Sequence, residues 1–385
     1  MDFAFAPEEE AFREEVRAFL DGELRDRPPG GLEAWQFYRD FIKKLAGKGW
    51  LTLAWPKEWG GQGAGHMQQL VYNEEVAYQD APAIDLGSDR VGPTIMLYGT
   101  DEQKQRFLPP IVAGEAVWCQ GFSEPGAGSD LASLQTRAVQ DGDEFVINGS
   151  KIWTSLAHLA QWMILLVRTD PDAPKHRGIS YFLLDMKTPG ITIRPLVDIL
   201  GQHRFNEVFF DDVRVPRDYL VGELNRGWYV ATATLDFERS GIQRMIGNLR
   251  TYEQLVDYAR ETHQNGSRLL DQQLVRNRLA ELKIEFEVGR LLAYRVAWMQ
   301  GQGFVPNYEA SVSKMYGSEL AQRLANAGVH ILGLGGQLTP GSPWAPLHGS
   351  IESLYLSTAA LTIAAGTSEV QRNIIAGRGL GMPRD

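Results

Sequence analysis

Hydrophobic residues recur at helical spacing through the N-terminal part of the chain. Phe12, Val16 and Leu20 lie four residues apart, and Phe37 and Phe41 repeat this spacing further along. Such a period places these side chains on one face of a helix. The pattern therefore predicts amphipathic helices up to about residue 114.

Short apolar segments separated by turns replace the helical pattern after residue 115. The pair Asp141-Gly142 precedes the apolar run 145–147, and such a pair is typical of a hairpin turn. Short strands joined by turns predict a small antiparallel barrel or sandwich. The strands are expected at 145–147, 162–168, 179–184, 191–194 and 208–210.

Long helical stretches return after Asn225, with the short Gly- and Pro-containing connections of an antiparallel bundle. The order of helices, strands and helices contains no βαβ alternation, so a Rossmann-type dinucleotide fold is not expected. The sequence predicts a multidomain α+β chain with a helical domain at 1–114, a β domain at 115–225 and a helical bundle at 226–385. The bundle helices are expected at 226–262, 268–301, 306–332, 350–363 and 367–377.

Composition narrows the classes of partner. The chain has 385 residues and a formal net charge of −10, and it contains no Lys/Arg run that could neutralise nucleic-acid phosphates. The apolar run 162–167 is far shorter than the ~20 residues that a membrane-spanning helix needs. The acidic N-terminal segment lacks the basic start and apolar centre of a signal peptide. We therefore expect a cytoplasmic protein that binds neither nucleic acid nor membrane.

Metal and thiol chemistry is not expected. The single cysteine, Cys119, cannot form an intrachain disulfide or a multi-cysteine metal site, and we interpret it as a small buried hydrophobic residue. The seven histidines include no pair at i, i+4, as a helical zinc motif would require. Redox chemistry, if present, needs an organic cofactor.

The densest chemical signal is a Gly- and Ser-rich segment at 121–130, followed by a Trp-Thr-Ser segment at 153–155. Glycines let backbone approach a ligand closely, and small hydroxyls can hydrogen-bond a heteroaromatic ring that a tryptophan covers. An ordinary Ser/Gly turn is the alternative interpretation, because the segment lacks the third glycine of a dinucleotide fingerprint. The residues concerned are Ser123, Gly126, Gly128, Ser129, Trp153 and Ser155.

A glutamate lies on the apolar face of the first predicted bundle helix. Glu238 stands between Leu235 and Ile242 on that face. Full burial raises the pKa of a carboxyl group by up to ~3–5 units, which would suit Glu238 to act as a general base. The alternative is that Glu238 pairs with an arginine such as Arg239 or Arg244.

A third segment, 364–372, has a Gly turn that enters a helix with Thr367 and Ser368 in its first turn. Free N–H groups and the positive end of a helix dipole suit a pyrophosphate. Ordinary N-capping, which needs no ligand, is the alternative.

In this order and spacing, these segments resemble the acyl-CoA dehydrogenase family over essentially the whole chain. The resemblance implies an α-helical N-domain, an antiparallel β-barrel middle domain and a C-terminal four-helix bundle. It also implies FAD-dependent introduction of an α,β double bond into acyl-CoA thioesters, with electron-transfer flavoprotein as electron acceptor. The matching motifs are 98–104, 122–130, 147–153, 212–216 and 365–372.

The resemblance also implies site roles by motif position. The flavin ring is expected to be surrounded by residues of the β domain, with Ser155 near the reactive N5 edge; they are Phe122, Ser123, Trp153 and Ser155. The CoA portion and its entrance are expected to meet Ser129, Asp236 and Arg239.

A neighbouring subunit clamps the adenosine half of FAD in this family, which implies a homotetramer, or a heterotetramer of two unlike chains. Arg260 and Thr262 match the clamp, and Thr367 and Glu369 match the contacts on the pyrophosphate side. Three residues depart from the family pattern on the adenine side of the cofactor: His263, His330 and Leu334.

The position of the catalytic base divides the family. Many members carry a glutamate directly before the Gly-Thr of the last motif, where this chain has Ala365. A subset, including isovaleryl-CoA, long-chain and bacterial steroid side-chain enzymes, carries it on the first bundle helix in an Asp-x-Glu-Arg context, which Glu238 matches. The resemblance thus implies Glu238 as the base, with the backbone N–H of Ala365 polarising the thioester carbonyl.

Two other functions are compatible with the same residues. One is an acyl-CoA oxidase or flavin monooxygenase on the same fold. The other is a chain that acts as one subunit of a heteromeric dehydrogenase. Chain length, branching and a steroid tail of the acyl group are not distinguished by the sequence.

Overall fold

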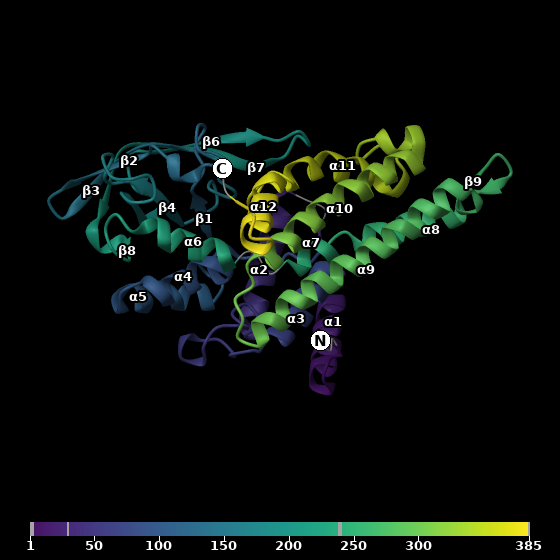
Figure 1. Cartoon of the computed structure of the whole chain (residues 1–385), viewed down its shortest axis with the longest axis horizontal. Helices are drawn as coiled ribbons and strands as arrows, with labels where there is room; N and C mark the ends of the chain where they lie inside the picture. The colour runs from purple at the N-terminus through teal and green to yellow at the C-terminus, as the bar shows by residue number, and fades with distance from the viewer. Residues whose placement is uncertain (1–3, 29–30, 238–240, 384–385) are drawn as a thin grey trace. The chain divides into compact units, whose positions relative to one another are not determined.

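A computed structural model of the chain describes residues 4–28, 31–237 and 241–383, within two compact units (Figure 1). Each unit combines part of the N-terminal helical region with a later part of the chain. These two units do not test the domain boundaries expected from the sequence, which remain a prediction. Unit 1 comprises Met1–Arg27, Gly65–Ala81 and Arg239–Asp385, and unit 2 comprises Pro28–Ala64 and Pro82–Glu238.

Unit 2 is built on an eight-stranded sheet. Seven strands follow the order β6-β7-β3-β2-β4-β5-β8, and β1 pairs with β4. Most neighbours are antiparallel as predicted, but β1 and β2 each pair with β4 in parallel, which corrects the expectation of a wholly antiparallel sheet. The strands are β1 Trp118–Gly121, β2 Arg137–Asp141, β3 Glu144–Lys151, β4 Trp162–Arg168, β5 Ile179–Asp185, β6 Ile191–Val197, β7 His203–Pro216 and β8 Leu220–Val221.

Both faces of β4 are buried, which explains its unbroken apolar sequence. Ile164 packs into a core with residues of the helices on one side of the sheet, and Met163 packs into a second core on the other side. Cys119 belongs to this second core, as predicted, and burial raises the pKa of its thiol. The helices of unit 2 are α2 Gly31–Gly47, α4 Gly92–Tyr98, α5 Asp101–Val112 and α6 Gly227–Phe237.

The two strands with many polar residues, β2 and β7, were not predicted correctly from the sequence. β7 extends over fourteen residues, although its apolar signal covered only 208–210, and β2 was not predicted. Exposed positions dominate β2 and alternate with buried ones in β7. Pairing with β3 on both sides holds these strands in the sheet, so a continuous apolar run is not their signature.

Unit 1 contains the predicted bundle of long helices. α10 packs against both α9 and α11, and Leu255, Phe286, Leu324 and Ile351 from four helices meet in one core. The helices of unit 1 are α1 Pro7–Glu23, α3 His66–Tyr78, α7 Ile242–Ile246, α8 Leu249–Glu261, α9 Gln273–Gly301, α10 Tyr308–Leu332, α11 Ser350–Leu361 and α12 Ser368–Ile374.

The prediction of one helix over 226–262 is wrong, because that segment forms α6, α7 and α8. Gly241 precedes α7 with φ of 74°, a left-handed conformation that the interior of a right-handed helix does not contain. The single apolar stripe that placed Glu238 between Leu235 and Ile242 is therefore not the face of one helix. Glu238 itself lies outside the described residues.

A short hairpin between α8 and α9 was also missed. β9 His263–Gln264 pairs with β10 Ser267–Arg268, and the turn residues Asn265 and Gly266 have φ of 52° and 81°. Two positive φ values are the mark of a type I′ turn, for which Asn-Gly is the preferred sequence. The predicted helix start at 268 therefore moves to Gln273.

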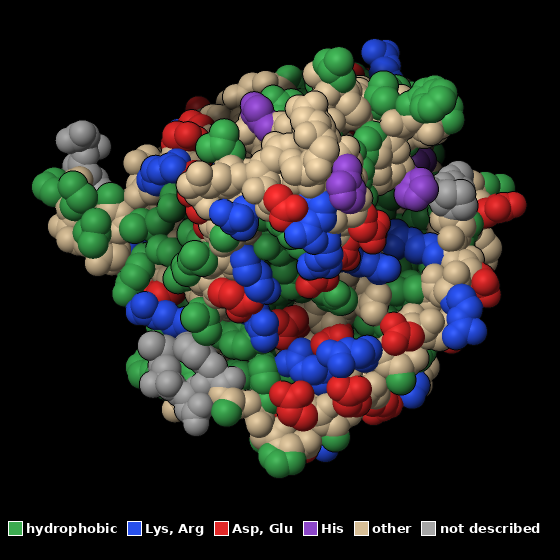
Figure 2. Space-filling view, turned by 90° about the vertical axis from the view of Figure 1, so that its right-hand side faces the viewer, with side chains coloured by type: hydrophobic (Ala, Val, Ile, Leu, Met, Phe, Trp, Pro, Cys, Tyr) green, Lys and Arg blue, Asp and Glu red, His purple; other side chains and the backbone are tan. Residues whose placement is uncertain are grey.

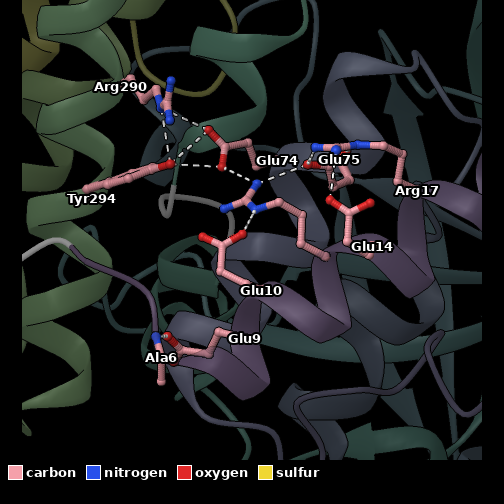
Figure 3. A network of polar contacts seen from close by, with 10 residues as sticks. Ala6, Glu9, Glu10, Glu14, Arg17, Glu74, Glu75, Arg290 and Tyr294 are labelled. Atoms are coloured by element: carbon pink, nitrogen blue, oxygen red, sulfur yellow. Dashed lines mark hydrogen bonds and ion pairs between the residues drawn. The ribbon is translucent and has the colours of Figure 1, made fainter.

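A buried polar network joins α1, α3 and α9 within unit 1 (Figure 3). Arg13 Nη1 lies 2.9 Å from a carboxylate oxygen of Glu74 and 2.9 Å from one of Glu75. Tyr294 from α9 donates its hydroxyl to Glu74 at 2.8 Å. Because buried charges are stable only when paired, this network ties the N-terminal helix to the bundle.

Replacing Arg13 by Met is expected to lower the free energy of unfolding by ~1–3 kcal/mol, the range for leaving buried acceptors without a donor. The loss is limited because Glu75 keeps Arg17 at 3.0 Å and Glu74 keeps Arg290 at 3.1 Å. Urea unfolding of the wild type and the variant measures the difference. Equal midpoints would show that the network does not stabilise the fold.

Candidate functional site

The Gly- and Ser-rich segment forms a tight loop directly after β1. Glu124 and Ala127 exchange two backbone hydrogen bonds of 2.9 and 3.0 Å, so the loop folds back on itself. A Cβ added to Gly126 or Gly128 would meet no atom within 4 Å. With Ser123 half-buried beside it, the loop offers backbone and a hydroxyl to a ligand.

A buried ion pair anchors this loop to β3. The Lys151 side chain is 0 % exposed, and its Nζ lies 2.7 Å from Glu124 Oε1 and donates to the Phe122 carbonyl at 3.0 Å. Glu124 also accepts backbone N–H groups from Gln135 and Thr136, at 2.6 and 2.9 Å. These bonds fix both ends of the loop.

The environment of the pair shifts both pKa values. Burial alone would raise the pKa of Glu124, but the charge and hydrogen bond of Lys151 outweigh it and hold that pKa below its ordinary value. Burial lowers the pKa of Lys151 to about 8, against the attraction of Glu124. The pair is therefore ionised at neutral pH.

The segment after β3 presents an indole and a hydroxyl on a strained turn. Trp153 and Leu156 have φ of 59° and 58°, a region that costs a non-glycine residue about 1–3 kcal/mol and clusters at functional sites. The Trp153 side chain is 60 % exposed and contacts Phe205 edge-on at 5.9 Å between ring centroids. Ser155 is exposed as well. A flat aromatic face and a hydroxyl are thus available to a ligand.

The C-terminal segment forms a second rigid turn, in unit 1. Ala365 and Gly366 both have positive φ, 55° and 84°, and Thr367 caps α12 by accepting the Val370 N–H at 3.2 Å. Lys314 Nζ donates to the Gly366 carbonyl at 2.7 Å. Within the described part of the chain, the Ala365 N–H donates to no other group. It is therefore free to polarise a ligand oxygen.

The residues expected on the adenosine side lie on and near α8 and α10. Arg260 is exposed and pairs with Asp257 at 2.5 Å, while Thr262 follows the last residue of α8. His330 is exposed near the end of α10, and Leu334 in the following turn is 86 % exposed.

The structure sorts the predicted site residues between the units. Asp236 lies in the last turn of α6, but its side chain is not described. Glu238 and Arg239 lie outside the described residues. Unit 2 holds Phe122, Ser123, Ser129, Trp153 and Ser155, and unit 1 holds Arg260, Thr262, Ala365, Thr367 and Glu369.

Sequence reasoning gave no role to Glu124, Lys151 or Asn206. Glu124 and Lys151 stand inside recognised motifs, and a charged residue at the end of an alternating strand is a usable signal for burial with a partner. Asn206 is fully buried and bonds to the Trp153–Ser155 turn. Nothing in its local sequence distinguishes it from a surface asparagine.

Other features of the described residues bear on the classes of ligand. No group of three His, Cys, Asp or Glu side chains among them could hold a metal ion. None of their helices is both long and apolar enough to cross a bilayer. On the face drawn in Figure 2, Lys and Arg side chains interleave with Asp and Glu.

Family models match nearly the whole chain in three parts. The acyl-CoA dehydrogenase N-terminal domain matches residues 6–115, the middle domain residues 119–213 and the C-terminal domain residues 225–380.

Individual relatives match from end to end. Acyl-CoA dehydrogenase IpdE1 of Mycobacterium tuberculosis is 40% identical over 98% of both chains, and acyl-CoA dehydrogenase FadE26 of the same organism is 38% identical over 100% of this chain and 99% of its own. Among solved structures, a chain of the ChsE4–ChsE5 complex from Mycobacterium tuberculosis has a TM-score of 0.91, and a chain of the Tcur3481–Tcur3483 steroid ACAD one of 0.89. Both are 38% identical over 100% of both chains.

Proposed function

The chain belongs to the acyl-CoA dehydrogenase family and is an acyl-CoA dehydrogenase, and on that basis we propose that it holds FAD against the loop after β1 and the Trp153–Ser155 turn. The observation that carries the proposal is the turn itself. Its strained backbone exposes the Trp153 indole, which only the edge-on contact with Phe205 touches among the ring contacts of the described residues, and the Ser155 hydroxyl.

The residues present fit a flat heteroaromatic cofactor. The buried Oγ1 of Thr154 has no hydrogen-bond partner among the described residues, and Gly126 and Gly128 leave open space over the neighbouring loop. When bound, FAD accepts the two electrons and the β-hydrogen that leave the substrate. The proposed ring contacts are Phe122, Ser123, Trp153 and Ser155.

The outer parts of FAD and the CoA portion meet other residues in this proposal. Thr367 and Glu369 lie on the pyrophosphate side, where backbone N–H groups at the start of α12 favour negative charge. Arg260 and Thr262 serve the FAD of a neighbouring subunit. The CoA portion of the substrate meets Ser129, Asp236 and Arg239.

Glu238 is the proposed base that removes the α-proton of the acyl group. Ala365 occupies the position of the commoner base and has no ionisable side chain. The free N–H of Ala365 donates to the thioester carbonyl instead, which stabilises the charge that develops on that oxygen as the proton leaves.

The proposed substrate is an acyl-CoA with a bulky group, of which a steroid side chain is the first to test. One similar structure is described as a steroid ACAD. In the commoner arrangement, the turn that faces the acyl group carries a glutamate at the position of Ala365. Alanine is smaller, so this turn leaves more room for the acyl group.

The proposed assembly is an oligomer in which a second subunit closes the adenosine site. His330 and Leu334 replace the polar and small residues of the family's cofactor turn, which favours pairing with an unlike chain over the homotetramer. Similar chains occur in complexes of two named proteins. Electron-transfer flavoprotein is the proposed electron acceptor.

The test begins with the purified chain, its flavin absorbance and its mass in solution. Anaerobic mixing with straight, branched and steroidal acyl-CoAs follows, with bleaching of the flavin as readout. Bleaching by steroidal substrates is expected, and bleaching by straight chains alone would overturn the substrate proposal. Purification of the chain without flavin, with FAD retained only beside an unlike partner, would support the heteromer.

A further inference from the structure

Asn206 on β7 holds the turn that presents the Trp153 indole. Its backbone C=O accepts the Thr154 N–H at 3.0 Å, and its backbone N–H donates to the Thr154 carbonyl at 3.1 Å. Its side-chain Nδ2 donates to the same carbonyl at 2.9 Å. Three hydrogen bonds therefore join one fully buried asparagine to the residue between the indole and the exposed hydroxyl.

The strain of this turn requires such a support. Two left-handed non-glycine residues, Trp153 and Leu156, flank Thr154 and Ser155, and strained residues persist only where their surroundings over-determine them. The Leu156 N–H donates to the Arg204 carbonyl at 3.4 Å. β7 thus supports the turn at both ends.

Two histidines fix the side-chain amide of Asn206. His203 Nε2 lies 2.7 Å from Asn206 Oδ1, and His158 Nδ1 lies 3.2 Å from Asn206 Nδ2. An amide oxygen accepts only and an amide nitrogen donates only, and the bond from Nδ2 to Thr154 sets the orientation. His203 must therefore donate through Nε2–H, and His158 must accept at an unprotonated Nδ1.

The same geometry opposes protonation of His158 at Nδ1. The two imidazole rings stack with their centroids 4.0 Å apart and an interplanar angle of 23°. A proton on His158 Nδ1 would turn an acceptor into a donor that faces the Asn206 NH₂ group. Two charged rings at this separation would also repel each other.

We propose that Asn206, His158 and His203 are positioning residues for the flavin-facing turn, and that protonation of His158 loosens it. The placement of the turn beside the flavin rests on the proposed function. The hydrogen bonds and the stacking stand on the structure alone.

The surroundings of His158 also favour its neutral form. Burial and the neighbouring charge of His203 lower the pKa of His158. Asp198 after β6 and Arg204 on β7 pair with each other at 3.5 Å. The other ionisable groups of β7 are Glu207, Asp211, Asp212 and Arg214. The pKa of His158 is lower in the folded protein than the ordinary histidine value. Neutral His158 therefore stabilises the fold at pH values above the ordinary pKa, and this stabilisation is lost as the pH falls through the folded-state pKa.

Hydrogen exchange of residues 153–160, read by mass spectrometry and corrected for intrinsic rates, tests the proposal without flavin. Between pH 8 and pH 5.5, protection in the wild type should fall about fivefold, the effect of losing one neutral hydrogen bond. The double variant His158→Asn/His203→Gln keeps an acceptor and a donor at matching positions but does not titrate, and its protection should not change with pH. Asn206→Ala should lower protection at both pH values.

His176→Asn makes the same exchange at a histidine that contacts Trp228 instead, and it should keep the wild-type response. The FAD dissociation constant is then measured over the same pH range. If the double variant follows the wild-type exchange curve, the positioning proposal is wrong. A pH-dependent exchange without any binding of FAD, either by the chain alone or beside an unlike partner chain, would instead refute the proposed function and leave the positioning role intact.

Discussion

Replacing Glu238 by Gln is expected to slow anaerobic flavin reduction by about 10²–10⁴-fold, the range that a positioned general base contributes. Glutamine keeps the shape of the side chain but cannot take a proton at neutral pH. The measurement is stopped-flow bleaching of the flavin with a substrate that reduces the wild type. Flavin content is set equal beforehand by absorbance, so that a change in rate is not a change in loading.

A matched control separates the base from a general effect of lost charge. Glu261→Gln makes the same chemical change on an exposed residue at the end of α8, and it should reduce flavin at the wild-type rate. Near-normal reduction by the Glu238 variant would remove it from the base role. In that case the carboxylate would have to come from another part of the chain or from a partner.

Replacing Lys151 by Met is expected to lower the free energy of unfolding by ~3–5 kcal/mol, as breaking one side of a buried ion pair does. The variant leaves the Glu124 carboxylate buried without the ammonium that lies 2.7 Å away in the wild type. Urea unfolding measures the loss. Flavin affinity should fall as well, since the loop after β1 depends on the same pair.

The double variant Glu124→Gln/Lys151→Met tests the cause. Both charges are absent from it. Gln135 and Thr136 donate to different carboxylate oxygens of Glu124 in the wild type, and the single glutamine oxygen can still accept one of these two backbone N–H groups. Removing both charges of a buried pair avoids the cost of leaving one of them unpaired, so part of the lost stability should return. If the double variant is as unstable as the single one, loss of packing around Lys151 is the cause rather than an unpaired charge.

Local patterns predicted the elements whose environment is uniform. β4 was predicted with its observed bounds because both of its faces are buried, and the helices of the bundle were predicted because their apolar faces repeat. The segment 226–262 failed for the opposite reason. α6 ends at Phe237 and a left-handed Gly241 precedes α7, while the apolar spacing of the sequence continues past Gly241.

The residues of the candidate site also divide into those that a local motif predicts and those that it does not. Trp153 and Ser155 carry a recognisable motif, and the structure exposes both. Lys151 and Glu124 are 27 residues apart in sequence, and Asn206 reaches Thr154 from another strand, 52 residues away. Such supports depend on tertiary pairing, which no periodicity encodes.

Unit 1 combines segments from both ends of the chain, so it cannot be completed until the last segment has been synthesised. Its first segments end at Ala81, and its last segment begins at Arg239. At a synthesis rate of ~5–20 residues per second, the ribosome needs about 8–30 s to bridge that interval. During this time α1 and α3 can pair through Arg13 and Glu74, but α9, which carries Tyr294, has not yet been synthesised. Unit 2 is complete first, and the nascent N-terminal helices are exposed to chaperones and proteases until the end of the chain has been made.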